Sequence, residues 1–432
     1  MIYKEFSIVI IVLQFKLFID EYNIRVNYII FKFTYEYAIN KRFVIKNSVV
    51  KLYIVPSWYP SFLHPEDGTF FKDRSKILNK NGFDVITIAN ILAPTKDIAQ
   101  IFKIKNNSPI ETASGIVYQK IRINPFPKIP RLSFKYYKYH LLKLFNQAVK
   151  ENGTPDYVFI NSSLWGGTAL GEYLYKNEIK FFVSEHLKEF LLNNAFTPYQ
   201  KQSIQNTYLY ASKIIATSSA LKNGISKNTS INDDKISVIP NPADVSSFKI
   251  KKESPNEIFN FISIALLREE KRLDLLLNAF LRVHNKFDYV RLTIVGDGPE
   301  KTKLLSLAKN LKIEHLVNFS GFLNKKDIAS LLPKCNTLIL NSDVETFGVV
   351  LVEAMASGIP VIATRCGGPT DIVTPETGYL INKDNIDELY QAMIKMFENH
   401  NSFNAEKIRK IAIQKYGDKA YAKSIFDLCK NI

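Results

Sequence analysis

The sequence predicts an α/β fold with two doubly wound, mostly parallel sheets. Short runs of β-branched and aromatic residues alternate with helical stretches over most of the chain, which is typical of parallel sheets flanked by helices. The chain has 432 residues, which is too long for a single core, and 46% of its residues are hydrophobic, as globular domains require. A charged, proline-bearing stretch at 249–257 separates two such series. We therefore expect one domain over 49–248 and a second over 249–414.

The first domain opens with a strand, a helix and a second strand. Residues 50–55 form a β-branched and aromatic run, and Pro56 ends it. Residues 69–80 predict a helix that Gly82 closes, and the next strand is expected at 84–89. Further strands are expected at 157–160, 181–183, 213–217 and 236–239.

The second domain repeats this alternation. Its strands are expected at 259–265, 291–295, 317–319, 337–340 and 361–364, with helices between them. In open α/β sheets, ligands bind beyond the carboxyl ends of the strands. Residues that directly follow a predicted strand are therefore the first candidates for a site.

Residues 1–48 do not resemble the rest of the chain. An apolar run near the start is interrupted by Lys16, Asp20 and Glu21, so it falls short of the ~20 residues of a membrane-spanning helix. It also lacks the small-residue cleavage site of a signal peptide. Three interpretations remain: a weak membrane-surface helix, a loosely packed tail, or upstream sequence translated from a start assigned too early. We favour the third.

The composition indicates anionic partners and a reducing compartment. The formal net charge of +16 and the pI near 9.4 suit nucleic acid, acidic lipid headgroups or phosphorylated substrates. No RNP, zinc-finger or Walker A pattern is present, so we rank nucleic acid last. Cys335, Cys366 and Cys429 lack CxxC spacing and the histidines lack HxxxH spacing, so we expect no disulfide framework and no metal. Three reduced cysteines fit the cytoplasm.

The stretch from Glu345 to Glu353 carries most of the functional signal. Glu345 lies on a predicted loop, and an apolar helix opens at Gly348. A helix start offers unpaired N–H groups and a positive dipole end, so a phosphate can bind there without a metal. Val349 and Glu353 share a helix face, which places a carboxylate one turn below that phosphate. Such a carboxylate can accept hydrogen bonds from ribose hydroxyls, so the pattern indicates a sugar-nucleotide site.

This stretch resembles the twin-glutamate motif of the retaining glycosyltransferases of the GT4 type. The likeness includes both glutamates and continues through Val361-Ile-Ala-Thr and Gly367-Gly-Pro. It implies the GT-B fold, in which two Rossmann-like domains face each other across a cleft. It also implies that a final segment, 415–432, packs back on the N-terminal domain.

The resemblance gives each residue of the motif an expected role. Glu345 would contact the transferred hexose, and Glu353 would bind the ribose. Backbone groups would contact the phosphate and the sugar at Thr346, Phe347, Gly348 and Val349.

A second segment resembles the part of the family that supplies cations. Lys271 matches the lysine that contacts the diphosphate, whose growing charge must be stabilised as it leaves. The family arginine has no match, because Leu266 occupies its position. Arg268, in the same loop, would have to reach the phosphate instead. A solvent-facing Arg268 is an equally good interpretation.

Three glycines and a histidine complete the candidate site. Gly296 and Gly298 match the family turn against which the nucleotide lies, although a tight turn alone would also explain them. Gly68 is either the glycine of the loop that meets the donor phosphates or an ordinary turn glycine. His186 follows a predicted strand and resembles a family histidine near the reacting sugar. A neutral imidazole there would hydrogen-bond the donor hexose or orient the acceptor.

The segment 124–145 interleaves lysines and arginine with aromatic residues and has almost no acidic residues. On a helix, this composition suits an anionic membrane interface. A core helix with solvated lysines explains it equally well. The first interpretation would bring the protein to the inner face of the membrane.

Together these features predict a cytoplasmic, metal-independent, retaining glycosyltransferase. It would move a hexose from a nucleotide-diphosphate sugar to a glycan or lipid-linked acceptor in surface polysaccharide synthesis. One alternative is a nucleotide-sugar isomerase or epimerase of GT-B fold. Another is a non-catalytic anion-binding scaffold, which Leu266 favours and which Lys271 and both glutamates oppose.

Overall fold

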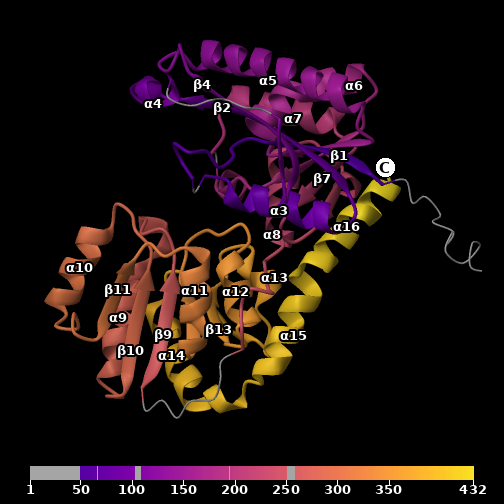
Figure 1. Cartoon of the computed structure of the whole chain (residues 1–432). Coiled ribbons are helices and arrows are strands. Elements are labelled where there is room, and N and C mark those ends of the chain that lie inside the picture. Colours follow the sequence, from indigo (N-terminus) through magenta and orange to yellow (C-terminus); the bar gives the residue numbers. More distant parts are fainter. Residues whose placement is uncertain (1–48, 66, 103–108, 194, 251–257) are drawn as a thin grey trace, which may run out of the picture. The chain divides into compact units, whose positions relative to one another are not determined.

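Two sheets, one of eight strands and one of six, form the framework of the chain (Figure 1). The computed structural model describes residues 49–65, 67–102, 109–193, 195–250 and 258–432. Within it, residues 51–432 make one compact unit. The extension 1–48 and most of the charged stretch, 251–257, lie outside the described residues, so what the sequence suggests for them stays a prediction.

The eight-stranded sheet has the order β3-β4-β2-β1-β5-β6-β7-β8 and is parallel except where β3 meets β4. Its strands are β1 Lys51–Pro56, β2 Asp84–Ala93, β3 Ile110–Thr112, β4 Gly115–Ile123, β5 Tyr157–Asn161, β6 Phe181–Glu185, β7 Lys213–Ala216 and β8 Ile236–Val238. The strand order reverses at β1, which pairs with β2 on one side and β5 on the other. The loop after β1 therefore leaves the sheet at its switch point, where open α/β sheets bind ligands.

The six-stranded sheet has the order β11-β10-β9-β12-β13-β14, and all its pairings are parallel. Its strands are β9 Phe259–Ile264, β10 Val290–Val295, β11 Val317–Gly321, β12 Thr337–Leu340, β13 Val361–Thr364 and β14 Gly378–Ile381. Here the order reverses at β9, between β10 and β12. The loop after β9 carries Lys271, so this lysine also stands at a switch point. The expected two doubly wound sheets are confirmed.

Helices connect the strands of both sheets. In the first sheet, Figure 1 shows α5 and α6 on one side and α3 and α8 on the other. Within the described ranges, no helix has both the length and the hydropathy needed to cross a bilayer. The helices are α3 Thr69–Lys80, α4 Ile98–Phe102, α5 Pro130–Asn152, α6 Thr168–Lys176, α7 Pro198–Tyr210, α8 Ser219–Asn228, α9 Leu273–His284, α10 Lys301–Asn310, α11 Lys325–Leu331, α12 Val349–Ala356, α13 Pro369–Ile372, α14 Ile386–Asn399, α15 Ala405–Tyr416 and α16 Asp418–Lys430.

Three strands were not anticipated from the sequence: β3, β4 and β14. β3 is three residues long and wholly exposed, and β4 is mostly only half-buried. Both lie at one edge of the eight-stranded sheet, where a strand needs no continuous apolar run. β14 is a four-residue edge strand of the other sheet. Such short or half-polar runs give too little periodicity to be recognised.

The central strands hold the functional loops in place. β6, β12 and β13 are buried along their whole length, and β5 is buried except at its first residue. Strands covered on both faces read as continuous apolar runs, and this is why the sequence located them closely. The loops that follow them start from a rigid edge.

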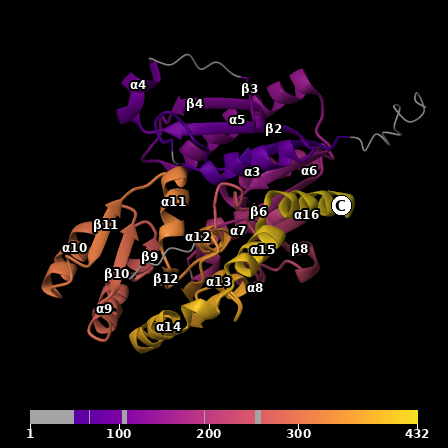
Figure 2. The same cartoon turned by 60° about the horizontal axis from the view of Figure 1, so that its bottom comes forward.

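The chain ends with two consecutive helices, α15 and α16, seen together in Figure 2. They are separated at Gly417, where a Cβ atom would lie 2.6 Å from the carbonyl oxygen of Ile413. α16 packs against the eight-stranded sheet and its helices. The Tyr157 hydroxyl donates a 2.7 Å hydrogen bond to the Cys429 carbonyl, and the rings of Phe83 and Phe426 meet edge to face at 6.2 Å.

Candidate active site

A pocket of about 520 Å³ collects most of the predicted site residues. Both sheets contribute to its lining. From the eight-stranded sheet come residues of α3 and the loops after β1 and β6, and from the six-stranded sheet come α11 and the start of α12. The lining includes Trp58, Thr69, Phe70, Asp73, Arg74, His186, Asn241, Asp244, Phe322, Lys325, Glu345, Thr346, Phe347, Gly348, Val349 and Glu353.

The loop that carries Glu345 is fixed by a neighbouring pair of glycines. The amide of Gly368 donates a 2.8 Å hydrogen bond to the Glu345 carbonyl. A Cβ atom on Gly367 would lie 2.4 Å from that same carbonyl oxygen, and one on Gly368 would lie 2.3 Å from the Cα atom of Phe347. Only glycine allows the two loops to approach so closely. This explains why the Gly-Gly-Pro sequence accompanies the glutamate motif.

Helix α12 begins in the pocket without a side-chain cap. Gly348 occupies the N-cap position with φ of 100° and ψ of 57°, a left-handed conformation that favours glycine. The Leu351 amide donates to the Gly348 carbonyl, but no side chain accepts from the first turn, so the N–H groups of Val349 and Val350 are available to a ligand. Val349 and Val350 line the pocket at this helix start. The helix start at which the sequence predicts an anion site therefore lines the pocket.

Lys271 and Glu345 form an ion pair beside this helix start. Lys271 ends a short 3₁₀ turn, Glu269–Lys271, in the loop after β9. Its Nζ lies 2.8 Å from Glu345 Oε2, and each side chain is about one-fifth exposed. The other carboxylate oxygen of Glu345 accepts a 3.4 Å hydrogen bond from the Phe347 amide. The pair brings together two residues that are 74 positions apart in the chain.

Glu353 is a buried carboxyl group that faces the pocket. Only 8% of the residue is exposed, and burial raises the pKa of Glu353 to about 7, helped by Asp244 and Asp73 and opposed by Lys325. Among the described residues none donates a hydrogen bond to its carboxylate. A ligand that donates hydroxyl groups would satisfy it, as the ribose prediction requires.

His186 lies directly after β6 and is neutral. Burial and the nearby Arg74 guanidinium hold the pKa of His186 well below its usual range. The Arg74 guanidinium donates to His186 Nε2 at 3.0 Å, and Ser184 Oγ also lies 3.0 Å from this nitrogen. Because an arginine can only donate, Nε2 is the acceptor and the ring proton sits on Nδ1. His186 thus has an N–H available for another acceptor.

Two family models match the chain in succession. The Glycosyltransferase Family 4 model matches residues 68–247, and the Glycosyl transferases group 1 model matches residues 244–415. This chain belongs to the GT4-type glycosyltransferases.

Curated relatives agree with this membership. Over 120 residues the enzyme is 42% identical to N-acetyl-alpha-D-glucosaminyl L-malate synthase from Bacillus anthracis, a match that covers 28% of this chain and 31% of that protein. It is 28% identical over 317 residues to an uncharacterized glycosyltransferase from Haemophilus influenzae, which covers 73% of this chain and 85% of that one. The first match thus spans less than a third of the relative.

Solved structures show the same fold. HepE from Anabaena, in complex with UDP, superposes with a TM-score of 0.67 at 19% identity and covers 89% of this chain and 100% of that one. Sucrose-phosphate synthase from Thermosynechococcus elongatus gives a TM-score of 0.70 at 16% identity, covering 88% and 98%. The glycosyltransferase therefore has the GT-B fold.

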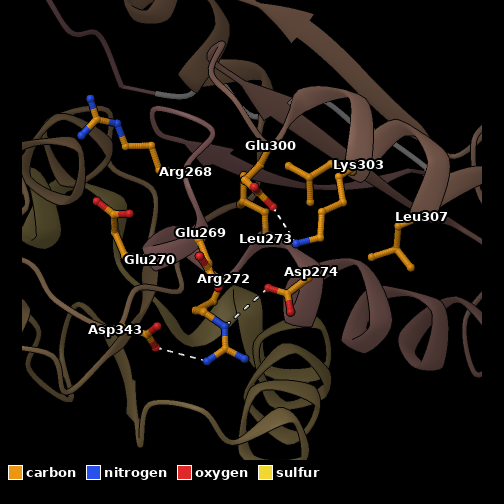
Figure 3. A pocket seen from close by; sticks show the side chains of 11 residues that line it. Arg268, Glu269, Glu270, Arg272, Leu273, Asp274, Glu300, Lys303, Leu307 and Asp343 are labelled. Carbon is orange, nitrogen blue, oxygen red and sulfur yellow. Dashed lines mark hydrogen bonds and ion pairs between the residues drawn. The ribbon is translucent and has the colours of Figure 1, made fainter.

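The structure does not bring Arg268 into the pocket of Glu345. Arg268 lines a second cavity of about 500 Å³ between α9 and α10. Figure 3 shows its side chain directed away from Arg272, which contacts Asp274 at 3.5 Å and Asp343 at 3.3 Å. Leu266, at the position of the family arginine, is 57% exposed. Lys271 is thus the cation of this loop that contacts Glu345, and neither Leu266 nor Arg268 supplies a second cation to the pocket.

Gly296 and Gly298 fix the loop after β9. A Cβ atom on Gly296 would lie 1.8 Å from the Ala265 carbonyl oxygen, and one on Gly298 would lie 2.5 Å from that of Leu267. Both glycines also have positive φ angles, 134° and 155°. Neither lines the pocket of about 520 Å³, so their evident task is to let two loops pack together.

Gly68 caps helix α3 at the switch point of the first sheet. Its φ of 65° is left-handed, and a Cβ atom there would lie 2.6 Å from the Trp58 carbonyl oxygen. Gly68 is not part of the pocket lining, but Trp58 and Thr69 are. The glycine thus shapes the loop that borders the pocket.

Two cationic residues of the pocket were missed by sequence reasoning: Arg74 and Lys325. Arg74 shares the buried face of α3 with Phe71 and Leu78, and a cation in such an apolar stripe was a usable signal. Lys325 lies at the first residue of α11, 3.2 Å from Asp73. Its position carries no motif, so only the fold reveals it.

Proposed function

We propose that this glycosyltransferase is a retaining, metal-independent, cytoplasmic enzyme that moves a hexose from a nucleotide-diphosphate sugar to a glycan or lipid-linked acceptor in surface polysaccharide synthesis. The observation that carries the proposal is the 2.8 Å Lys271–Glu345 pair beside the uncapped start of α12. Glu345 of this pair lines the same pocket as His186 and Glu353. Among relatives, the names N-acetyl-alpha-D-glucosaminyl L-malate synthase and alpha-monoglucosyldiacylglycerol synthase indicate small-molecule and lipid acceptors.

The reaction first requires that the leaving diphosphate be stabilised. As the bond between the donor sugar and its diphosphate breaks, negative charge grows on phosphate oxygens. In this proposal the Lys271 ammonium group, which is paired with Glu345, and the uncapped first amides of α12 stabilise that charge. This combination of a lysine and a helix start supports a mechanism in which the protein itself provides the positive charge.

The reaction also requires that the hexose be positioned for attack by the acceptor. Glu345 is engaged by Lys271 and by the Phe347 amide, which suits a group that positions the sugar rather than a free nucleophile. The acceptor oxygen would attack the anomeric carbon from the side on which the diphosphate leaves, and its proton would pass to a phosphate oxygen. The new bond then has the configuration of the broken one. The Nδ1–H group of His186 can donate to a sugar hydroxyl during this exchange.

A thermal-shift screen with UDP, GDP, ADP and their sugars tests the proposal. A nucleotide that binds only the folded state raises the melting temperature. The matching sugar nucleotide should then transfer its hexose with release of the diphosphate, and coupling constants in the proton spectrum of the product should show an unchanged anomeric configuration. Inversion at the anomeric carbon would refute retention. Isomerised sugar with no nucleotide release would instead establish the isomerase alternative.

The same screen should depend on pH because of Glu353. Its carboxyl group has a pKa raised to about 7 by burial, so it is protonated in the free protein below pH 7 and charged above it. The charged form is the better acceptor for ribose hydroxyls. We expect the melting-temperature shift from the matching nucleotide to be larger at pH 8 than at pH 6, and Glu353→Gln to remove this difference. A pH dependence that survives in Glu353→Gln would assign it to another group.

Helix α5 gives the membrane proposal a defined surface. Its inner face is in the core, whereas its start and the preceding loop expose apolar side chains: Ile129 is 50% exposed and Leu132 is 38% exposed. Lys128, Arg131 and Lys135 are exposed beside them. Apolar groups flanked by cations suit an anionic membrane surface. We propose that this α5 surface brings the enzyme to the inner membrane face.

Vesicle flotation checks the α5 surface. We expect binding to phosphatidylcholine vesicles that contain phosphatidylglycerol, and weaker binding to pure phosphatidylcholine or at high salt. Replacing Lys128, Arg131 and Lys135 by alanine should remove most of the binding. In a matched control, alanine replaces the exposed lysines Lys309, Lys334 and Lys395. This control has the same net charge as the α5 variant and should bind like the wild type. Equal binding to neutral and anionic vesicles at low salt would count against the proposal.

A further inference from the structure

Arg74 is a buried guanidinium at the edge of the active-site pocket. It belongs to α3, is only 2% exposed and lines the pocket together with His186 and Glu345. It donates hydrogen bonds to Asn161 Oδ1 at 3.2 Å and to His186 Nε2 at 3.0 Å. It also donates to Asn241 Oδ1. All three acceptors are neutral, because His186 is held uncharged.

The charge of Arg74 has no carboxylate partner among the described residues. Lys271 is paired with Glu345, and Lys325 is paired with Asp73, whereas no ion pair in the same ranges includes Arg74. Burial lowers the pKa of Arg74, but a guanidinium remains protonated in proteins. An unpaired buried cation is costly, so some other group must offset its charge in the working enzyme.

Aromatic rings compensate the charge only in part. The guanidinium carbon lies 5.6 Å from the ring centroids of Phe70 and Phe71 and 5.9 Å from that of Tyr421. Cation–π contacts at such distances are weak compared with a charge-assisted hydrogen bond to an oxyanion. A guanidinium carries five N–H groups, and three hydrogen bonds to protein acceptors account for only part of them. The rest can serve a ligand.

We propose that Arg74 is an oxyanion-binding residue of this pocket, which takes a ligand that places a phosphate or carboxylate oxygen against the guanidinium. Such an anion would supply the missing counter-charge. This inference rests on the proposed function, in which the oxyanion is either the diphosphate of the donor or an acidic group of the acceptor. In the first case Arg74 provides, from the eight-stranded sheet, the second cation that Leu266 and Arg268 do not provide from the loop after β9.

Isothermal titration of the full chain with pyrophosphate, UDP and uridine distinguishes these sources without requiring sugar transfer. If the thermal-shift screen selects another base, the matching nucleoside diphosphate and nucleoside replace UDP and uridine. If the diphosphate is the oxyanion, Arg74→Gln should weaken pyrophosphate and UDP binding about tenfold or more and leave uridine binding unchanged, as expected for loss of a charge-assisted contact. If the acceptor carries it, Arg74→Gln should leave UDP binding intact and abolish the binding of inorganic phosphate to the UDP-saturated enzyme. Unchanged affinity for all of these ligands would overturn the proposal.

A purely structural arginine gives a different result, and Arg409→Gln is the matched control. Arg409 donates to the carbonyls of Phe248 and Ala356 and lies outside the pocket lining. Its replacement should lower the melting temperature without changing any of these affinities. If Arg74→Gln does not fold, Arg74→Lys keeps the charge but lacks the planar fork, and pyrophosphate or phosphate affinity weakened at least threefold still supports the proposal. Wild-type affinity in Arg74→Lys would overturn it. If sugar transfer is not observed, the proposed function fails, but these binding measurements still test the proposal for Arg74.

Discussion

Glu345→Gln is expected to lower sugar transfer by about 100- to 1,000-fold while the protein stays folded, the range typical for loss of one group that stabilises a transition state. The substitution keeps the shape of the side chain but removes its charge. The Lys271 ammonium group, now 2.8 Å from the carboxylate, would lose the partner that holds it in place beside the start of α12. The hexose would also lose a charged acceptor. Both losses act on the reacting centre and not on the core.

Transfer from the sugar nucleotide found in the thermal-shift screen measures this effect, with circular dichroism and the melting temperature as checks on folding. Glu376→Gln is the matched control. Glu376 forms the same kind of pair, 2.8 Å from Lys407, but it is 52% exposed and does not line the pocket. Its replacement should leave transfer near the wild-type rate. A fully active Glu345→Gln enzyme would remove Glu345 from the reaction.

The fold was predictable where side-chain pattern and burial coincide. Strands covered on both faces, such as Phe181–Glu185 and Val361–Thr364, require continuous apolar runs, and such runs are visible in the sequence. The helix Thr69–Lys80 was located at its true bounds, because Gly68 and Gly82 mark its two ends. Half-polar strands near the edge of a sheet, such as Gly115–Ile123, carry no such signal, since water rather than protein covers part of their surface.

The site was predictable where a motif brings its residues close in sequence. Glu345, Gly348 and Glu353 lie within nine positions, so their arrangement around a helix start follows from the helix geometry. The contact between Lys271 and Glu345 spans 74 positions and needed the family resemblance. The proposed role of Arg74 depends on three neighbours that are far apart in the sequence: Asn161 at the end of β5, His186 after β6 and Asn241 after β8.

Lys271→Ala is expected to reduce transfer about as strongly as Glu345→Gln, but by a different route. Lys271 is the cation in the loop after β9 that reaches the pocket, through its pair with Glu345. Removing it should weaken the binding of the nucleoside diphosphate selected by the thermal-shift screen more than that of its nucleoside, because only the former carries the diphosphate. It also leaves Glu345 charged and without its partner in a site that is about one-fifth exposed, which further disfavours an anionic leaving group.

Arg268→Ala separates this role from the general charge of the loop. Arg268 stands three residues before Lys271 and lines the other cavity, where its side chain is directed away from Arg272 (Figure 3). Both substitutions remove one positive charge from the same loop, so a long-range electrostatic effect would lower transfer equally in both. We expect transfer to fall in Lys271→Ala and to change by less than about threefold in Arg268→Ala, since an exposed charge outside the pocket is largely screened. Equal losses, measured as kcat and as KM for the donor, would mean that Lys271 acts through the general charge of the loop and not through its position beside Glu345.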